Sequence, residues 1–166
     1  MGDWTGTVPT FAAGAKLRGV DMATLAAIDT ALVTGWTTWV PTLTNMTLGS
    51  GTQIAKYRRL GKAVDFRWRF VYGAGSAVGT DPQFTLPVAA AAEYLTAVEA
   101  PFSGRYTDAS VGASVAHARP IFFTSASNIL LYYFSAAATI ASITSTAPWT
   151  WTTSDSLNVW GTYYTD

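Results

Sequence analysis

The strongest pattern in the chain is a strict alternation of apolar and charged residues between positions 64 and 72. One parity holds the apolar side chains and the other the charged ones: Val64, Phe66, Trp68, Phe70 and Tyr72 against Asp65, Arg67 and Arg69. A pleated strand places alternate residues on opposite faces. Because burying each large apolar side chain is worth roughly 1.5–3 kcal/mol, a second layer must cover the apolar face. We therefore expect an all-β fold, an antiparallel β-sandwich or jelly-roll-like domain, with this strand in the middle of a sheet.

Short strands separated by turn signals fill the rest of positions 36–166. The other expected strands are 37–43, 52–60, 83–86, 96–106, 111–118, 120–124, 128–135 and a closing strand that includes Leu157–Tyr164. Pro41 restricts the first strand to a sheet edge or a bulge, and Gly61-Lys62 predicts a hairpin into the central strand. We expect loops at 73–82 and, in preference to a helical turn, at the alanine-rich 89–92. About eight short strands with intervening turns are typical of a sandwich or jelly roll.

The segment 128–135 is apolar on both faces. Ile129, Leu131 and Tyr133 alternate with Leu130, Tyr132 and Phe134. Such a strand is expected to be buried on both sides or to lie against another subunit.

The first 35 residues have a different pattern. Residues 1–20 are rich in glycine and lack a regular period, which predicts an extended arm with apolar anchors at Trp4, Val8 and Phe11. Residues 21–35 have the apolar period of a short helix, capped at Asp21 and stopped at Gly35. Within that helix, Leu25, Ile28 and Leu32 have the spacing of a coiled-coil seam. The helix could lie on its own sheet or form a small bundle between identical subunits.

Composition restricts the partners. The chain has 166 residues, about one domain, with ten basic and ten acidic residues, so its net charge gives no long-range attraction to nucleic acid or anionic lipid. No apolar run reaches the length of a membrane span, and the start lacks the pattern of a secretory signal. We expect a soluble, unprocessed chain. The absence of cysteine excludes disulfides, thiolate metal sites and cysteine nucleophiles.

Catalytic patterns are weak throughout the chain. His117 is the only histidine, and sequence assigns it no nucleophile, carboxylate or second metal ligand. The carboxylates are scattered, so no glycosidase pair can be chosen. Gly73–Gly79 has the wrong spacing for a phosphate-binding loop and no following helix. We predict no catalytic residues, no metal site and no cofactor.

Two groups of side chains remain as candidates for binding. The basic cluster surrounds Asp65 and consists of Lys56, Arg58, Arg59, Lys62, Arg67 and Arg69. It is either a solvated sheet face with cross-strand ion pairs or a docking face for an acidic partner, led by Arg67 and Arg69. Direct DNA binding is disfavoured because the interleaved aromatic residues point to the opposite face. Trp149, Trp151 and Trp160 are candidates for stacking on sugars, although tryptophans in a β-core are mostly explained by packing.

Several motifs resemble a module of tailed bacteriophages. They are Trp36-Thr37-Thr38-Trp39-Val40-Pro41-Thr42-Leu43-Thr44-Asn45, Leu48-Gly49-Ser50-Gly51-Thr52, the run from Ala55 to Phe66, Phe84-Thr85-Leu86-Pro87, Pro148-Trp149-Thr150-Trp151, Asp155 and Gly161-Thr162-Tyr163. They are similar to the β-rich domain of small virion surface proteins, particularly in phages of actinobacteria. The opening Val8-Pro9-Thr10-Phe11-Ala12-Ala13-Gly14 is similar to the N-terminal arms of those proteins.

The resemblance implies a non-enzymatic virion protein of the capsid-decoration, head-fibre or minor-tail type, generally trimeric. The hypothesis is a homotrimeric capsid decoration protein on the virion surface, assembled in the host cytoplasm. Trp4, Val8 and Phe11 would bind the major capsid protein, and subunit contacts would lie at Leu25, Ile28, Leu32, Leu131 and Tyr133. The alternative is a minor tail or fibre protein that recognises a host surface glycan, with partner or glycan contacts at Arg67, Arg69, Trp149 and Trp151. Neither hypothesis includes nucleic acid or membrane as a partner.

Overall fold

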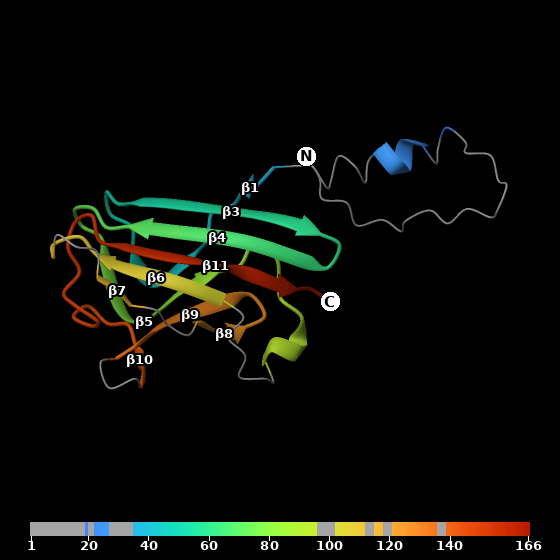
Figure 1. Cartoon of the computed structure of the whole chain (residues 1–166). Helices are drawn as coiled ribbons and strands as arrows, with labels where there is room; N and C mark the ends of the chain where they lie inside the picture. The colour runs from blue at the N-terminus through green and yellow to red at the C-terminus, as the bar shows by residue number, and fades with distance from the viewer. Residues whose placement is uncertain are drawn as a thin grey trace.

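Two antiparallel β-sheets form the body of the protein, as the computed structural model shows (Figure 1). The structure describes residues 19, 22–26, 35–95, 102–111, 115–117, 121–135 and 139–166, without the side chains of 115–117 and 121–123. In Figure 1 the layer that holds β3, β4, β11 and β6 covers the layer that holds β5, β9 and β8. The predicted all-β sandwich-like fold is confirmed.

The larger sheet has six strands in the order β1-β3-β4-β11-β6-β7. Their bounds are β1 (Thr37–Thr38), β3 (Thr52–Leu60), β4 (Ala63–Val71), β11 (Ser156–Tyr164), β6 (Phe102–Asp108) and β7 (Val115–His117). Strand β4 pairs along its whole length with β3 on one side and β11 on the other. The strand that the alternation placed in the middle of a sheet does lie there, between Ala63 and Val71.

The smaller sheet has five strands. The path is β10-β9-β5-β2, with β8 also paired to β9. Their bounds are β2 (Leu43–Thr47), β5 (Ala77–Thr85), β8 (Ile121–Ser125), β9 (Asn128–Phe134) and β10 (Ile140–Ser142). A 3₁₀ helix, η1 (Ala92–Leu95), begins at the last residue of the predicted loop 89–92, so the loop is shorter than predicted and leads into a helical turn.

Aromatic rings fill the space between the sheets. Along β4, the side chains of Val64, Phe66, Trp68 and Phe70 are at most 1% exposed. Phe84 reaches them from β5 of the other sheet: its ring stacks on Trp68 with centroids 4.4 Å apart and planes 13° apart. Offset or tilted ring pairs of this kind add to the hydrophobic gain from burial. The apolar face of the central strand is therefore covered by the second sheet, as its pattern required.

The predicted strand 37–43 is wrong as a single strand, and Pro41 supplies the reason. The chain forms β1 at the edge of the larger sheet, leaves it around Val40–Thr42, and forms β2 at the edge of the smaller sheet. Proline has no backbone N–H for a ladder, and here Pro41 is buried at the crossing. The backbone N–H of Thr42 donates to Thr85 Oγ1 over 2.9 Å, which attaches the chain to its new sheet.

The predicted loop 73–82 is also wrong, because β5 begins at Ala77 and includes Pro82. Its pairing with β2 changes register between Thr44 and Met46, so an extra loop of β5 bulges opposite Asn45. Asn45 and Asp81 both have positive φ, 56° and 54°. The Asn45 amide closes the bulge by donating to the carbonyl of Thr80 over 2.9 Å. Glycine, aspartate and proline in the sequence marked this bulge and not the end of a strand.

Glycines allow two turns at one end of the sandwich to touch. The Ser50 N–H donates to the Ala74 carbonyl over 2.9 Å, and Ser76 Oγ donates to the Leu48 carbonyl. A Cβ placed on Gly73 would lie 2.5 Å from the backbone N of Gly51. The glycine-rich stretch after β4 therefore connects strands and packs against a neighbouring turn.

Candidate functional site

The outer face of the larger sheet carries the predicted basic cluster. Ladder pairing places Lys56 of β3 opposite Arg67 of β4, and Arg67 opposite Trp160 of β11. One row further, Arg69 lies opposite Ile54 on one side and Asn158 on the other. Asn158 is in turn opposite Arg105 of β6. Side chains from four neighbouring strands thus share one face.

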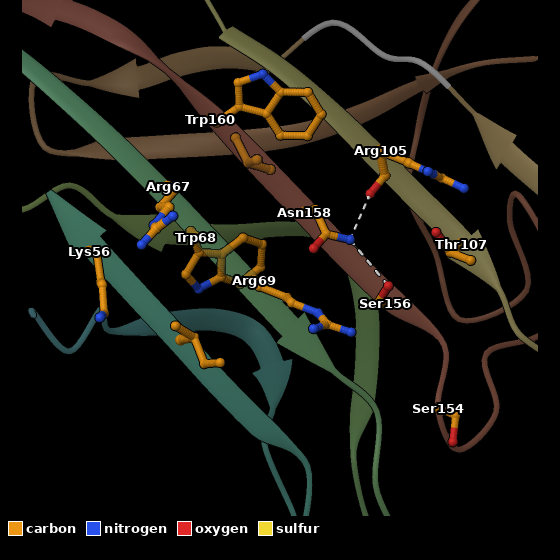
Figure 2. Close-up of a pocket in the computed structure, with 12 residues that line it drawn as sticks. Lys56, Arg67, Trp68, Arg69, Arg105, Thr107, Ser154, Ser156, Asn158 and Trp160 are labelled. Carbon is orange, nitrogen blue, oxygen red and sulfur yellow. Dashed lines mark hydrogen bonds between the residues drawn. The ribbon is translucent and has the colours of Figure 1, made fainter. Parts of the chain in front are cut away.

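These rows line an open depression of about 850 Å³ on the sheet (Figure 2). We call it the basic depression, and its lining residues are Ile54, Lys56, Arg67, Trp68, Arg69, Arg105, Thr107, Ser154, Ser156, Asn158, Val159 and Trp160. Four of them are bases and none is an acid. Lys56 and Arg67, which have the same charge, face each other directly, an arrangement that destabilises a sheet by itself. The depression is therefore a concentrated positive surface.

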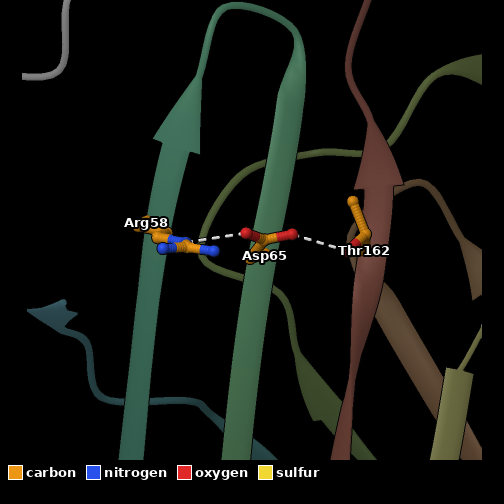
Figure 3. Close-up of polar contacts among 3 residues, drawn as sticks. All are labelled: Arg58, Asp65 and Thr162. Atoms are coloured by element: carbon orange, nitrogen blue, oxygen red, sulfur yellow. Dashed lines mark hydrogen bonds and ion pairs between the residues drawn. The ribbon is translucent and has the colours of Figure 1, made fainter. Parts of the chain in front are cut away.

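Asp65 lies just outside the basic depression, and its carboxylate already accepts hydrogen bonds from Arg58 and Thr162 (Figure 3). Arg58 Nε donates to its Oδ2 over 2.7 Å, and Thr162 Oγ1 donates to its Oδ1 over 2.5 Å. Burial raises the pKa of Asp65, but the hydrogen bonds from Thr162 and Arg58 and the Arg58 charge outweigh it, so that the pKa lies below its usual value. No carboxylate of the described residues lines the basic depression itself.

Trp36 organises the neighbouring side of the cluster. The guanidinium of Arg67 lies 4.8 Å from the centre of the Trp36 ring, and that of Arg58 lies 5.3 Å from it. Cation–π contacts of this length hold guanidinium groups in place. Arg67 and Trp160 also line a smaller depression of about 360 Å³ that contains Trp36 and Asp65. The two hollows therefore share Arg67 and Trp160 as lining residues.

The floor of the basic depression is polar. The Asn158 amide N–H groups donate to the Arg105 carbonyl over 3.3 Å and to Ser156 Oγ over 3.2 Å, as Figure 2 shows. These bonds fix the orientation of the amide and use its donor atom. The Oδ1 atom of Asn158 stays available as an acceptor for a bound molecule.

The tryptophans divide between core and surface. Trp151 is only 9% exposed, stacks on Tyr72 with ring centroids 5.5 Å apart, and donates from Nε1 to the Thr144 carbonyl over 2.9 Å. Trp149 packs against the core and against Trp151. The structure thus places Trp151 in the core and Trp149 beside it, so the proposed glycan contact at Trp151 is corrected: a buried ring cannot stack on a sugar. Trp160, by contrast, is 46% exposed among the bases.

The residues proposed as subunit contacts also differ in burial. Leu131 is fully buried in the core of its own chain, and Tyr133 is partly buried against it; Leu131 therefore has no surface to offer a second subunit. On the other face of β9, Phe134 is 43% exposed and faces Ile140 across the ladder. Residues 22–26 are helical, and Leu25 is half-buried. Ile28, Leu32 and the anchors Trp4, Val8 and Phe11 lie outside the described residues.

Three other described carboxylates support the fold. Buried Asp155 accepts hydrogen bonds from the backbone N–H groups of Ala109 and Thr152, over 2.8 and 2.7 Å. Asp108 accepts from Ser110, and Asp81 from Ser142. No group of three or more possible metal ligands occurs within the described part of the chain. His117 lies in β7 as predicted, and its side chain is outside the description.

Buried tyrosines add polar contacts inside the sandwich. Burial raises the pKa of Tyr163, whose hydroxyl donates to the Val88 carbonyl over 2.7 Å. Burial, and then the charge of Asp155, raise the pKa of Tyr72. Both hydroxyls therefore stay protonated over a wider pH range than an exposed tyrosine.

Sequence reasoning found Arg67, Arg69 and Trp160 as candidates but assigned them to separate hypotheses, and it missed Arg105 and Asn158. Comparisons of the chain with protein-family models, with curated protein sequences and with solved structures gave no match. No helix of the described residues has the length and apolar character needed to cross a membrane.

Proposed function

We propose that this chain is a non-enzymatic structural protein of a tailed-phage virion: a homotrimeric capsid decoration protein on the head surface. Residues 1–35 would dock it on the major capsid protein and hold the three copies together, and the β-sandwich would face the solvent. The motif resemblance across positions 36–66 and 148–163 supports the virion context. The arrangement of the described residues supports the division of labour between the two parts.

One observation carries this proposal: the described core of the sandwich contains no residue from 22–26, the described part of the helical segment. The buried apolar residues run from Met46 to Tyr163, and none comes from residues 22–26. Met22 remains 52% exposed and Leu25 half-buried. A short helix with uncovered apolar side chains is marginal in water on its own, so a partner surface is expected to stabilise it. A seam of Leu25, Ile28 and Leu32 from three copies would provide that surface.

The helix seam can be tested by its oligomeric state. Light scattering on the full chain should give a molecular mass of three times 17.7 kDa. Leu25→Asp should give a monomer with an unchanged near-ultraviolet circular dichroism spectrum, because the charge opposes helix association but lies outside the sandwich core. Ala23→Asp places the same charge on an exposed position of the same helical segment and should remain trimeric. A wild-type monomer at micromolar concentration would refute the trimer.

Attachment can be tested separately with phage particles from which the protein has been stripped. The full chain should co-sediment with them, and a chain lacking residues 1–20 should stay trimeric but remain in the supernatant. Continued binding of the shortened chain would remove the arm from the mechanism. Antibody-gold labelling of intact particles should place the protein on the head.

A second candidate function is favoured by the basic depression. A minor tail or fibre protein that recognises a host surface glycan would need an exposed aromatic ring beside polar side chains, and Trp160 among Arg67, Arg69 and Asn158 has this arrangement. The same gold labelling separates the candidates, because a receptor-binding protein should be found at the tail and not on the head.

A further inference from the structure

We propose that the basic depression is a binding site for a carboxylate-bearing oligosaccharide, with Trp160 beneath one sugar ring and Arg67 and Arg69 on the carboxylates. This inference goes beyond capsid decoration, which needs no ligand on the outer sheet. It deepens the second candidate function by naming the ligand class, and it does not depend on where the protein sits in the virion.

The first argument is the charge. Lys56, Arg67, Arg69 and Arg105 line one hollow, and no described carboxylate lies among them. Asp65, which lines the smaller neighbouring hollow, is held by Arg58 and Thr162. Repulsion between Lys56 and Arg67, which lie directly opposite each other, destabilises the sheet. An anion bound between the two strands would relieve that repulsion. Guanidinium groups form paired hydrogen bonds with carboxylates, so a carboxylate fits the arginines of this site.

The second argument is the position of Trp160. Its strand directs Leu157, Val159 and Tyr163 into the core, where all three are fully buried, whereas Trp160 points outward and is 46% exposed. The indole therefore contributes little to the core of its own chain. It is anchored in the middle of a sheet, between Arg67 and Ser103 of the flanking strands. A rigid apolar plate bordered by polar groups suits the face of a sugar ring, whose C–H bonds pack on the indole while its hydroxyls bind the polar neighbours.

The third argument is size and hydrogen bonding. The hollow extends from β3 to β6, three strand spacings or about 14 Å, which suits a short oligosaccharide. Asn158 is held by Ser156 and the Arg105 carbonyl with its Oδ1 free to accept. Ser154, Ser156 and Thr107 add hydroxyl groups to the lining. Fixed acceptors and hydroxyls beside an aromatic ring match the alternating donors and acceptors of a saccharide.

Other anionic polymers fit the site less well. Single-stranded nucleic acid is usually bound by several rings on which successive bases stack; here Trp160 is the exposed ring of the hollow, and Trp36 is already covered by Arg58 and Arg67. An acidic peptide that binds by strand addition needs a free sheet edge. Strands β4 and β11, which carry Arg67, Arg69 and Trp160, are paired on both sides, so these three residues do not lie at such an edge.

The test is isothermal titration calorimetry of the full chain with four probes: hexagalacturonate, its fully methyl-esterified form, hexaglutamate and a twelve-nucleotide oligothymidylate. Hexagalacturonate should bind, with an affinity that falls as salt is raised, and the neutral ester should bind at least tenfold more weakly. The double variant Arg67→Gln/Arg69→Gln and the single variant Trp160→Ser should each lose at least tenfold in affinity for hexagalacturonate.

Matched controls make the test specific. Lys62→Gln removes one positive charge from the turn between β3 and β4, and Tyr164→Ser removes an aromatic ring that is 54% exposed on the same face of β11 but outside the hollow. Both variants should bind like the wild type. The proposal is overturned if hexagalacturonate does not bind at millimolar concentration, if the ester binds equally, if the peptide or the oligonucleotide binds more tightly, or if the controls lose as much affinity as the site variants. Trimer formation and particle attachment would be unaffected by any of these results.

Discussion

Replacement of Phe84 by alanine should test how the two sheets hold together. Phe84 is 1% exposed and is the β5 residue whose ring meets both Trp68, at 4.4 Å between centroids, and Phe66, at 6.3 Å. Truncating a fully buried phenylalanine typically costs about 3–5 kcal/mol, from lost burial and from the cavity left behind. Against a total stability of about 5–15 kcal/mol, this is a large fraction. For a chain of this size, the melting temperature should fall by roughly 6–20 °C.

The measurement is equilibrium unfolding in urea, followed by tryptophan fluorescence. Phe134→Ala is the matched control: it deletes the same side chain from the neighbouring strand β9, where the ring is 43% exposed, and should cost less than about 1 kcal/mol. A double-mutant cycle of Trp68→Leu and Phe84→Leu should give a coupling of about 0.5–1.5 kcal/mol from the ring stack. Equal losses for Phe84→Ala and Phe134→Ala would refute the role of this stack.

Three further predictions concern polar groups and turns, each measured by the same urea unfolding. Asp155→Asn should cost about 1–3 kcal/mol, because the amide cannot accept from both the Ala109 and the Thr152 N–H; an unchanged midpoint would contradict this. Tyr163→Phe should cost about 1 kcal/mol through the unpaired Val88 carbonyl. The raised pKa of Tyr163 gives stability that is present below its ordinary value of 10.0 and lost as pH rises above it, so the variant should lose less stability in alkali than the wild type. Gly73→Ala should cost about 1–3 kcal/mol, because the added Cβ would lie 2.5 Å from the Gly51 nitrogen, whereas Gly61→Asn at φ +60°, with open space around it, should be nearly neutral; similar losses would argue against close contact of the two turns.

The alternation of large side chains was the part of the fold that sequence could predict. The four apolar residues of one parity in β4, and Tyr72 directly after it, all became buried, because they share the face that the second sheet covers. The same reasoning failed for β5, where Gly79, Asp81 and Pro82 look like a loop. Those residues form a bulge whose closure depends on Asn45, more than thirty residues away in the chain. Local propensity does not contain that partner.

The candidate site was only partly visible for a related reason. Parity along 156–164 would have placed Trp160 outside, since Leu157, Val159 and Tyr163 all point inward. Which strands flank β11 is a matter of long-range pairing, and sequence gave no means of bringing Arg105 and Asn158 next to Arg69. Trp151 lies outside the strands, where no alternation of side chains indicates whether an aromatic ring points inward or outward. Its burial could therefore not be predicted. Its burial follows from the stack on Tyr72.

The position of β11 has a consequence for how the protein is made. This strand lies between β4 and β6, and its contact from Thr162 to Asp65 spans 97 residues. While a ribosome is still synthesising the segment before Ser156, β4 has an open flank and the rings beneath it have an incomplete cover. The larger sheet can close only after residue 164 has left the exit tunnel, so the nascent chain must be kept from pairing that flank with a neighbouring nascent copy.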